Sequence, residues 1–203
     1  MKHSTKSKDW LIAAFFVVFL PGPDSQVSIQ PSSSITIKGT STLHDYECST
    51  KTFEGMIELD HSDKVFTSVD ISIPVLSLHS NSTSMDDNMY DALKAKQYPR
   101  IQFSLLPSDS VRIAHAQADS MLHLQGNLTI AGKQKLIDLQ LVVAKNGNGI
   151  IRVHGTKKLL MTDFGIDPPT FMLGVLKTGN EVTIEFSLEL KDPNPQAQAN
   201  SAK

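Results

Sequence analysis

Residues Met121–Val143 form two alternating runs of apolar and polar side chains, separated by a short break that contains glycine. In the first run apolar residues occupy every second position from Leu122 to Ile130, and in the second run they do so from Ile137 to Val143. This period of two predicts an antiparallel β-hairpin with one face hidden from water. Because a single hairpin is at best marginally stable in water, the rest of the chain must cover that face.

The same alternation predicts further strands along most of the chain, at Ile35–Thr40, Phe53–Leu59, Val69–Val75, Ile101–Leu105, Val111–Ile113, Ile151–Gly155 and Glu181–Lys191. One helix is predicted between the third and fourth of these, with Ser84 as its N-cap and Pro99 at its end. Met85 and Met89 lie on one face of this helix and either pack it onto the sheet or form a lid. The whole pattern predicts a mainly β fold, an antiparallel barrel of about eight strands or a sandwich, with one short helix.

Size and charge limit the possible functions. A chain of 203 residues that is 40% hydrophobic is ordinary for one globular domain with a sizeable core. The formal net charge of −2 provides no basic field for nucleic acid, which we therefore do not expect as a partner. A single cysteine, Cys48, excludes an intramolecular disulfide and a cysteine-rich metal site.

The N-terminus has the parts of an export signal. Lys2, Lys6 and Lys8 precede an apolar run from Trp10 to Leu20, which Pro21 then interrupts. We expect residues 1–25 to be a signal peptide or an N-terminal anchor, with no membrane span in the mature chain, and the domain to be periplasmic or secreted. A linker is expected at 26–33, the barrel at 34–191, and a disordered tail at 192–203.

No set of residues with catalytic or metal-binding spacing stands out. His44, Asp45, Glu47 and Cys48 are close in sequence, but on an extended segment Asp45 and Glu47 point away from His44 and Cys48. We therefore expect His44 to be a hydrogen-bonded turn residue. The chain also lacks the nucleophile elbow and the zinc-protease motif. We predict no catalytic residues, no metal and no enzymatic activity.

Several segments, taken in order, resemble the YceI-like family of exported, lipocalin-like barrels that bind polyisoprenoids. They are Ser34–Ile37 with Thr42–His44, Phe53–Ile57, Met89–Leu93, Tyr98–Phe103, Gly126–Gly132, Asp163–Ile166 and Asn180–Val182. Two stretches depart from the family pattern, Tyr46–Ser49 and Ser82–Asp86. The resemblance implies a lipocalin-like barrel that encloses the apolar tail of an isoprenoid lipid, with polyprenyl lipids or isoprenoid quinones as candidates. It implies no other cofactor.

The inward faces of the strands are apolar, as a pocket for an apolar ligand requires. They also carry Gly39, Gly55, Gly126 and Gly155, which either leave space along the barrel axis or relieve sheet curvature over a filled core. The apolar loop Met161–Leu176 either lines the mouth of a cavity or plugs the end of the barrel. The residues expected to line a cavity are Phe53, Ile71, Ile73, Phe103, Leu124, Leu128, Leu139, Leu141, Phe164, Phe171, Met172 and Phe186.

Two functions follow from these alternatives. A hollow barrel predicts a non-catalytic carrier or sequestering protein for an isoprenoid lipid. A filled barrel predicts a structural or interaction domain that acts through its loops. Whether the chain forms a homodimer stays open in both cases.

Overall fold

The predicted hairpin is formed by strands β8 (Ser120–Ile130) and β9 (Lys133–Lys145) of a computed structural model, which describes residues 25–60, 65–106, 111–112, 120–146, 148–171 and 176–193. Leu124 pairs with Leu139, so apolar side chains face each other across the two strands. The turn residues Ala131 and Gly132 both have positive φ, the conformation of the two-residue turns that fit the twist of a hairpin.

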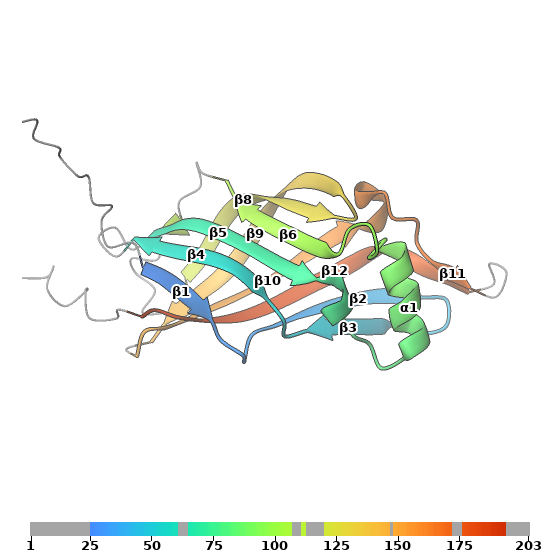
Figure 1. Cartoon of the computed structure of the whole chain (residues 1–203), viewed down its shortest axis with the longest axis horizontal. Coiled ribbons are helices and arrows are strands. Elements are labelled where there is room, and N and C mark those ends of the chain that lie inside the picture. The colour runs from blue at the N-terminus through green and yellow to red at the C-terminus, as the bar shows by residue number, and fades with distance from the viewer. Residues whose placement is uncertain are drawn as a thin grey trace, which may run out of the picture.

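Eight strands close into an antiparallel barrel (Figure 1). Around the barrel the order is β1-β4-β5-β6-β8-β9-β10-β12, and β12 pairs with β1 to complete the ring. The remaining bounds are β1 Ser25–Ile29, β2 Ser34–Ser41, β3 Tyr46–Thr50, β4 Glu54–Asp60, β5 Val65–Pro74, β6 Arg100–Leu105, β7 Val111–Arg112, β10 Ile150–Leu160, β11 Thr170–Phe171 and β12 Leu176–Lys191, with short 3-10 turns η1 at Val75–Ser77 and η2 at Met161–Phe164. The predicted antiparallel barrel with one short helix is confirmed.

Strand β12 is long enough to pair with two other strands along the same edge. Its N-terminal part pairs with β2, and its last residues pair with β1. Ser33 lies at the kink between β1 and β2, fully buried, and its hydroxyl oxygen accepts a hydrogen bond from the backbone N–H of Glu189 at 2.9 Å. The linker expected at 26–33 is contradicted for 26–29, which lie in β1. Its polar composition conceals the single apolar pair Val27 and Ile29 that faces the barrel interior.

A second strand, β3, was not predicted from the sequence because it is only five residues long. It pairs with β2 on one side, and on the other side Ser49 forms a two-way backbone bridge with His79 at 2.8 and 2.9 Å. Tyr46 and Cys48 alternate on the inward face of this strand.

Helix α1 (Thr83–Ala92) lies across one end of the barrel (Figure 1). Its N-cap is Ser82, two residues earlier than the predicted Ser84, because Ser82 has extended backbone angles and its carbonyl accepts the first helical bonds. The helix also stops earlier than Pro99, since Lys94 adopts a left-handed φ of 54° that ends the helical path.

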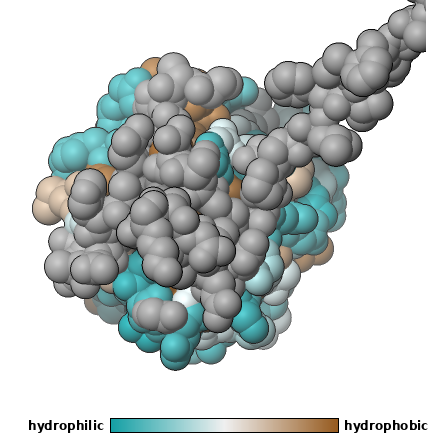
Figure 2. Space-filling view, turned by 90° about the vertical axis from the view of Figure 1, so that its left-hand side faces the viewer, coloured by the Kyte–Doolittle hydropathy of each residue, from teal (hydrophilic) through white to brown (hydrophobic). Residues whose placement is uncertain are grey.

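The opposite end of the barrel carries both described ends of the chain, at β1 and at the end of β12 (Figure 1). Asp192, expected in the disordered tail, is buried here, where its carboxylate pairs with Nζ of Lys145 at 3.3 Å and its backbone N–H donates to the carbonyl of Gly149. The folded chain thus extends to this residue, while 194–203 lie outside the described residues. In the view onto this end, hydrophilic side chains predominate around the edge (Figure 2).

Candidate functional site

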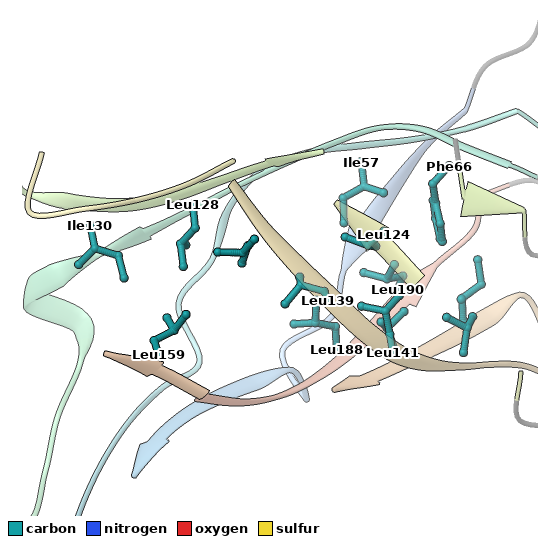
Figure 3. Close-up of a cluster of buried hydrophobic side chains, with 14 of the residues drawn as sticks. Ile57, Phe66, Leu124, Leu128, Ile130, Leu139, Leu141, Leu159, Leu188 and Leu190 are labelled. Atoms are coloured by element: carbon teal, nitrogen blue, oxygen red, sulfur yellow. The ribbon is translucent and has the colours of Figure 1, made fainter. Parts of the chain in front are cut away.

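The barrel encloses a cavity of about 490 Å³ on its axis. Its wall consists mainly of the inward aliphatic and aromatic side chains of β5, β6, β8, β9, β10 and β12, with further side chains from β2, β3 and β4. In the close-up, Leu128 and Ile130 extend from one wall toward Leu159 on the opposite wall (Figure 3), and all three line the cavity. The volume falls in the range of pockets that hold small apolar ligands.

The cavity is closed at the end that carries the first and last described residues of the chain. Ile57, Phe66 and Leu190, which we call the floor, line its deepest part and are each at most 5% exposed. In Figure 3, Ile57, Phe66 and Leu190 lie toward one end of the labelled cluster, and Leu128, Ile130 and Leu159 lie toward the other. Behind the floor lies a second set of buried side chains that do not line the cavity, namely Val27, Leu59, Val143 and Ile151.

Helix α1 and the segment after β10 cover the other end. Met85, Met89, Ala92 and Leu93 of the helix and its C-terminal cap line the cavity, although no side chain of α1 is fully buried. The two methionines therefore face the lumen from above instead of packing into a filled core. Met161, Phe164, Ile166 and Pro169 complete this end, so the described part of the loop Met161–Leu176 forms wall rather than a central plug.

Polar groups of the cavity gather at this covered end. They come from the β2–β3 turn, the N-terminal part of α1 and the start of β12, as Ser41, His44, Ser82, Ser84, Asn88, Lys177 and Thr178. No carboxylate is found among the described residues that line the cavity. Lys157 also lines it, but its Nζ donates to the backbone carbonyl of Asp138 at 2.8 Å. A ligand in this cavity would thus meet hydrocarbon along its length and hydrogen-bonding groups at one end.

Three glycines of the wall are covered by aromatic rings. A Cβ atom on Gly39 would overlap the ring of Tyr46, one on Gly126 the ring of Phe103, and one on Gly155 the ring of Phe186. Each ring occupies the space above a glycine of an adjacent strand, a known way of protecting strand glycines. The glycines therefore neither leave vacant pits nor sit beneath a filled core; they let large rings lie against the wall and keep the axis free.

A small polar network holds α1 in place over the cavity. Asp86, in the first turn of the helix, accepts hydrogen bonds from the backbone N–H of Ser80 at 2.7 Å and from its hydroxyl at 2.6 Å, and Nδ1 of His79 lies 3.2 Å from its other oxygen. The hydrogen bonds from Ser80 lower the pKa of this carboxyl below its usual value. One turn later, the hydroxyl of Tyr90 donates to the carbonyl of Leu78 at 2.7 Å.

Cys48 lies in the cavity wall under this helix. It is 2% exposed, and burial is the main cause that raises the pKa of its thiol to about 11, with the charges of Asp86 and Glu47 adding to it. At neutral pH the group is therefore a neutral thiol, which acts as a small apolar side chain rather than as a nucleophile.

The residues predicted to line a cavity come together from distant parts of the chain. Those that line it are Ile71, Ile73, Phe103, Leu124, Leu128, Leu139, Leu141, Phe164 and Phe186. Phe53 packs against the buried cluster instead, because it precedes β4 outside the ring of strands. The side chain of Phe171, and Met172 as a whole, lie outside the described residues. Contact of any of these with a ligand stays a prediction.

Residues of β3 and α1 also line the cavity, although they are not among the residues predicted to do so. Tyr46 and Cys48 alternate in a way that could have revealed a short strand, and the spacing of Met85 and Met89 already marked one helix face. Both stretches that depart from the YceI-like pattern, Tyr46–Ser49 and Ser82–Asp86, contain residues that line the covered end.

His44 is a hydrogen-bonded turn residue, as predicted. Its Nδ1 lies 2.8 Å from the backbone carbonyl of Asp45, and the hydroxyl of Ser41 donates to its carbonyl at 2.7 Å. Within the part of the chain that the structure describes, no group of three or more His, Cys, Asp or Glu side chains is placed to hold a metal ion.

A second hollow of about 550 Å³ lies on the outer surface over β2, β9, β10 and β12. Its lining mixes polar residues such as Gln140, His154 and Glu185 with the exposed Met121. Unlike the axial cavity, this open hollow offers no enclosed apolar volume.

Comparisons with known families and with solved structures agree with one another. The pattern of the YceI-like domain matches residues 26–190. The fold is similar to crystal structures of BcnA from Burkholderia cenocepacia, with a TM-score of 0.63, 20% identity and coverage of 80% of this chain and 99% of that one. It is also similar to a polyisoprenoid binding domain from Saccharophagus degradans, implicated in plant cell wall breakdown, with a TM-score of 0.60, 14% identity and coverage of 83% and 98%.

The YCEI protein of Campylobacter jejuni is similar as well, with a TM-score of 0.56, 23% identity and coverage of 71% of this chain and 84% of that one. No curated protein sequence gives a significant match. Among the described residues, none of the helices combines the length and the apolar character needed to cross a bilayer.

Proposed function

The chain belongs to the YceI-like domain family, and from this membership and its axial cavity we propose that it binds an isoprenoid lipid, either a polyprenyl lipid or an isoprenoid quinone, and carries or sequesters it without chemical change. The tail lies along the barrel axis, and the headgroup lies at the covered end among His44, Asn88 and Lys177.

The observation that carries this proposal is the composition of the cavity. Hydrocarbon and aromatic side chains surround it along its depth, and the polar groups are restricted to one end. An isoprenoid lipid has the same division into a long apolar tail and a polar head. Each methylene equivalent transferred from water into such a site contributes on the order of 0.8 kcal/mol, so a few isoprene units suffice for useful affinity.

The proposal is a binding role rather than an enzymatic one. The thiol of Cys48 is held neutral, and the polar residues that line the covered end do not include a carboxylate within the described residues. The groups beside a bound headgroup, among them His44, Asn88 and Lys177, serve as its hydrogen-bond partners. The Saccharophagus domain described as polyisoprenoid binding supports the ligand class. The basic and apolar N-terminal segment supports export, and we propose action in the periplasm or outside the cell.

Native mass spectrometry of the protein expressed in a bacterium tests this proposal. We expect a population heavier than the polypeptide, with a mass difference that organic extraction identifies as an isoprenoid. Adding polyprenols or quinones to stripped protein should raise its melting temperature, because a ligand that binds only the native state stabilises it. The control is Leu128→Trp, which places a large ring in the cavity and should abolish both effects. A bare mass together with an unchanged melting temperature would contradict the proposal.

A further inference from the structure

Strands β9 and β10 are paired with each other over only part of their length. The ladder between them ends where Gly155 of β10 pairs with Leu141 of β9. Beyond this point, residues 156–160 of β10 are paired with β12, and residues 133–140 of β9 are paired with β8. Within the described residues no ladder joins these two edges, which we call the seam. The seam lies in the half of the barrel that α1 covers.

Both edges of the seam carry apolar side chains on the inside and on the outside of the barrel. Ile137 and Leu159 are buried and line the cavity. Counting five residues along each strand from the last pair of the ladder reaches Leu136 and Leu160, which are opposite each other in that register. These two leucines are 55% and 41% exposed, and Leu160 also lines the cavity. An apolar path therefore leads from the cavity across the seam to the surface.

Lysine side chains cross the seam in place of a ladder. Nζ of Lys157 donates to the backbone carbonyl of Asp138 at 2.8 Å, and Nζ of Lys135 lies 3.3 Å from Oδ1 of Asp163 in η2. Lys135 and Asp163 are both about half exposed, and an ion pair in such a position contributes little to stability. A lysine side chain has a flexible stem, so it can release its acceptor without a change in the backbone. The seam can therefore open more easily than a ladder of backbone hydrogen bonds.

The covered end of the cavity is held more firmly than the seam. Helix α1 is fixed by Asp86, whose carboxylate accepts two hydrogen bonds from Ser80, and by Tyr90, whose hydroxyl donates to the carbonyl of Leu78. Displacing the helix would break these contacts together, and those to a charged carboxylate are the stronger kind of hydrogen bond. A route between β9 and β10 leaves all of them in place.

Resting on the proposed function, we propose that the seam is a lateral portal through which the apolar tail enters and leaves the cavity, and that Lys157 is its latch. When Lys157 releases the carbonyl of Asp138, the two edges separate and the tail passes sideways between Leu136 and Leu160. The tail then meets hydrocarbon side chains throughout its passage, and α1 keeps its position over the headgroup.

A cross-link across the seam tests the portal. In a Cys48→Ala background, Leu136→Cys and Leu160→Cys are joined by a short bismaleimide, and the joined protein is compared with the same variant before cross-linking. Each is loaded with geranylgeraniol in a nonionic detergent, and replacement by the deuterated alcohol is followed by native mass spectrometry. We expect the cross-link to slow uptake and release by at least about tenfold each, since a closed portal limits both rates, and to leave the dissociation constant unchanged.

The matched control joins two strands that are already paired. Gln125→Cys and Asp138→Cys lie opposite each other on the exposed face of β8 and β9, in the same half of the barrel. The same reagent at this pair adds the same mass without closing the seam, so exchange should keep the rate it has before cross-linking.

A substitution of the latch tests the portal without a cross-link. Lys157→Met keeps the length of the side chain and removes its donor, so uptake and release should both accelerate, by about threefold or more. Lys158→Met is the control, because Lys158 is exposed and pairs with Glu181 across the intact ladder of β10 and β12.

The outcomes separate the portal from the function on which it rests. Unchanged exchange after cross-linking of the seam, or equal slowing in the control pair, overturns the portal and leaves lipid binding in place. Equal exchange rates for Lys157→Met and Lys158→Met overturn the role of Lys157 as the latch. Failure of the wild type to bind geranylgeraniol or any isoprenoid quinone overturns the proposed function, and the inference with it.

Discussion

Phe186 lies across the backbone of Gly155 in the neighbouring strand, and its ring occupies the place that a Cβ atom of residue 155 would need. We expect Gly155→Ala to push this ring from the wall toward the cavity and to lower the free energy of unfolding by about 1–3 kcal/mol, as overpacking of a core does. Urea denaturation measures the loss. In a Phe186→Leu background the same substitution should cost much less, and an equal cost in both backgrounds would show that the ring is not the cause.

The lowered pKa of Asp86 makes part of the stability depend on pH. Its carboxylate is hydrogen-bonded in the folded state only, so its contribution is complete above the pKa of the unfolded chain, ~3.9, and is lost as the pH falls through that value toward the lower folded pKa. We expect Asp86→Asn to be less stable than the wild type at pH 7, with a difference that shrinks between pH 4 and 3.

Denaturation midpoints from pH 7 to pH 3 test this dependence. Asp87→Asn, at an exposed neighbouring position of the same helix, is the control for removal of one negative charge. A difference between the wild type and Asp86→Asn that stays constant over the whole range would contradict the assignment.

The buried thiol of Cys48 should react slowly. With a pKa of about 11 its thiolate fraction at pH 7.5 is roughly a few hundred times below that of a free cysteine with a pKa of ~8.5, and access through α1 slows the reaction further. We expect slow labelling by a disulfide reagent in the native state, an increase with pH up to about 11, and one rapid equivalent in urea.

The matched control for this thiol moves it by one residue. In Cys48→Ser/Ser49→Cys the thiol lies on the exposed face of the same strand and should react rapidly in the native state. Equal native rates for the wild type and this double variant would mean that neither burial nor the raised pKa protects Cys48.

The packed end and the hollow end of the barrel should respond differently to the same truncation. Ile151 is fully buried behind the floor, so Ile151→Ala leaves a new cavity and should lower the free energy of unfolding by about 2–5 kcal/mol. Ile137 lines the existing cavity, so Ile137→Ala enlarges a space that is already present and should cost clearly less. Denaturation of the stripped protein compares the two, and equal losses would indicate that the cavity is filled.

Two ion pairs have the same N–O distance but differ in burial, so they show how burial changes the stability that an ion pair provides. Lys145 and Asp192 are 3.3 Å apart and shielded from solvent, while Lys135 and Asp163 are 3.3 Å apart and half exposed. Asp192→Ala leaves a shielded ammonium group unpaired and should cost about 3–5 kcal/mol. Asp163→Ala should cost about 0–1 kcal/mol. Thermal and urea unfolding measure both, and similar losses would contradict this distinction.

Sequence patterns predicted the barrel because its long strands alternate strictly. In β12, every second residue from Val182 to Leu190 faces the interior, and the register of β8 against β9 brings matching faces together. Such alternation follows directly from the pleat of a strand, so it can be recognised without knowing which strands pair with one another. The same regularity placed eight of the predicted lining residues around one cavity, and the ninth, Phe164, lies in η2.

Short or irregular elements could not be predicted from the alternation of apolar and polar residues. Strand β3 offers only Tyr46 and Cys48 as an inward pair, and β1 offers only Val27 and Ile29, so neither exceeds the alternation found by chance in a polar segment. The rings over Gly39 and Gly155 depend on which strands become neighbours, and the burial of Asp192 depends on Lys145 47 residues away. These features arise from tertiary pairing, which local patterns do not contain.

The position of Ser25 determines how a tether at this end of the domain would orient the barrel. This residue begins β1 at the closed base of the barrel, and the last described residues of the chain leave from the same base, whereas α1 covers the opposite pole. Any tether attached through the residues before Ser25 would therefore hold the barrel base-first against its support. The end of the cavity that α1 covers, with its polar lining, would then be directed away from the surface that holds the tether.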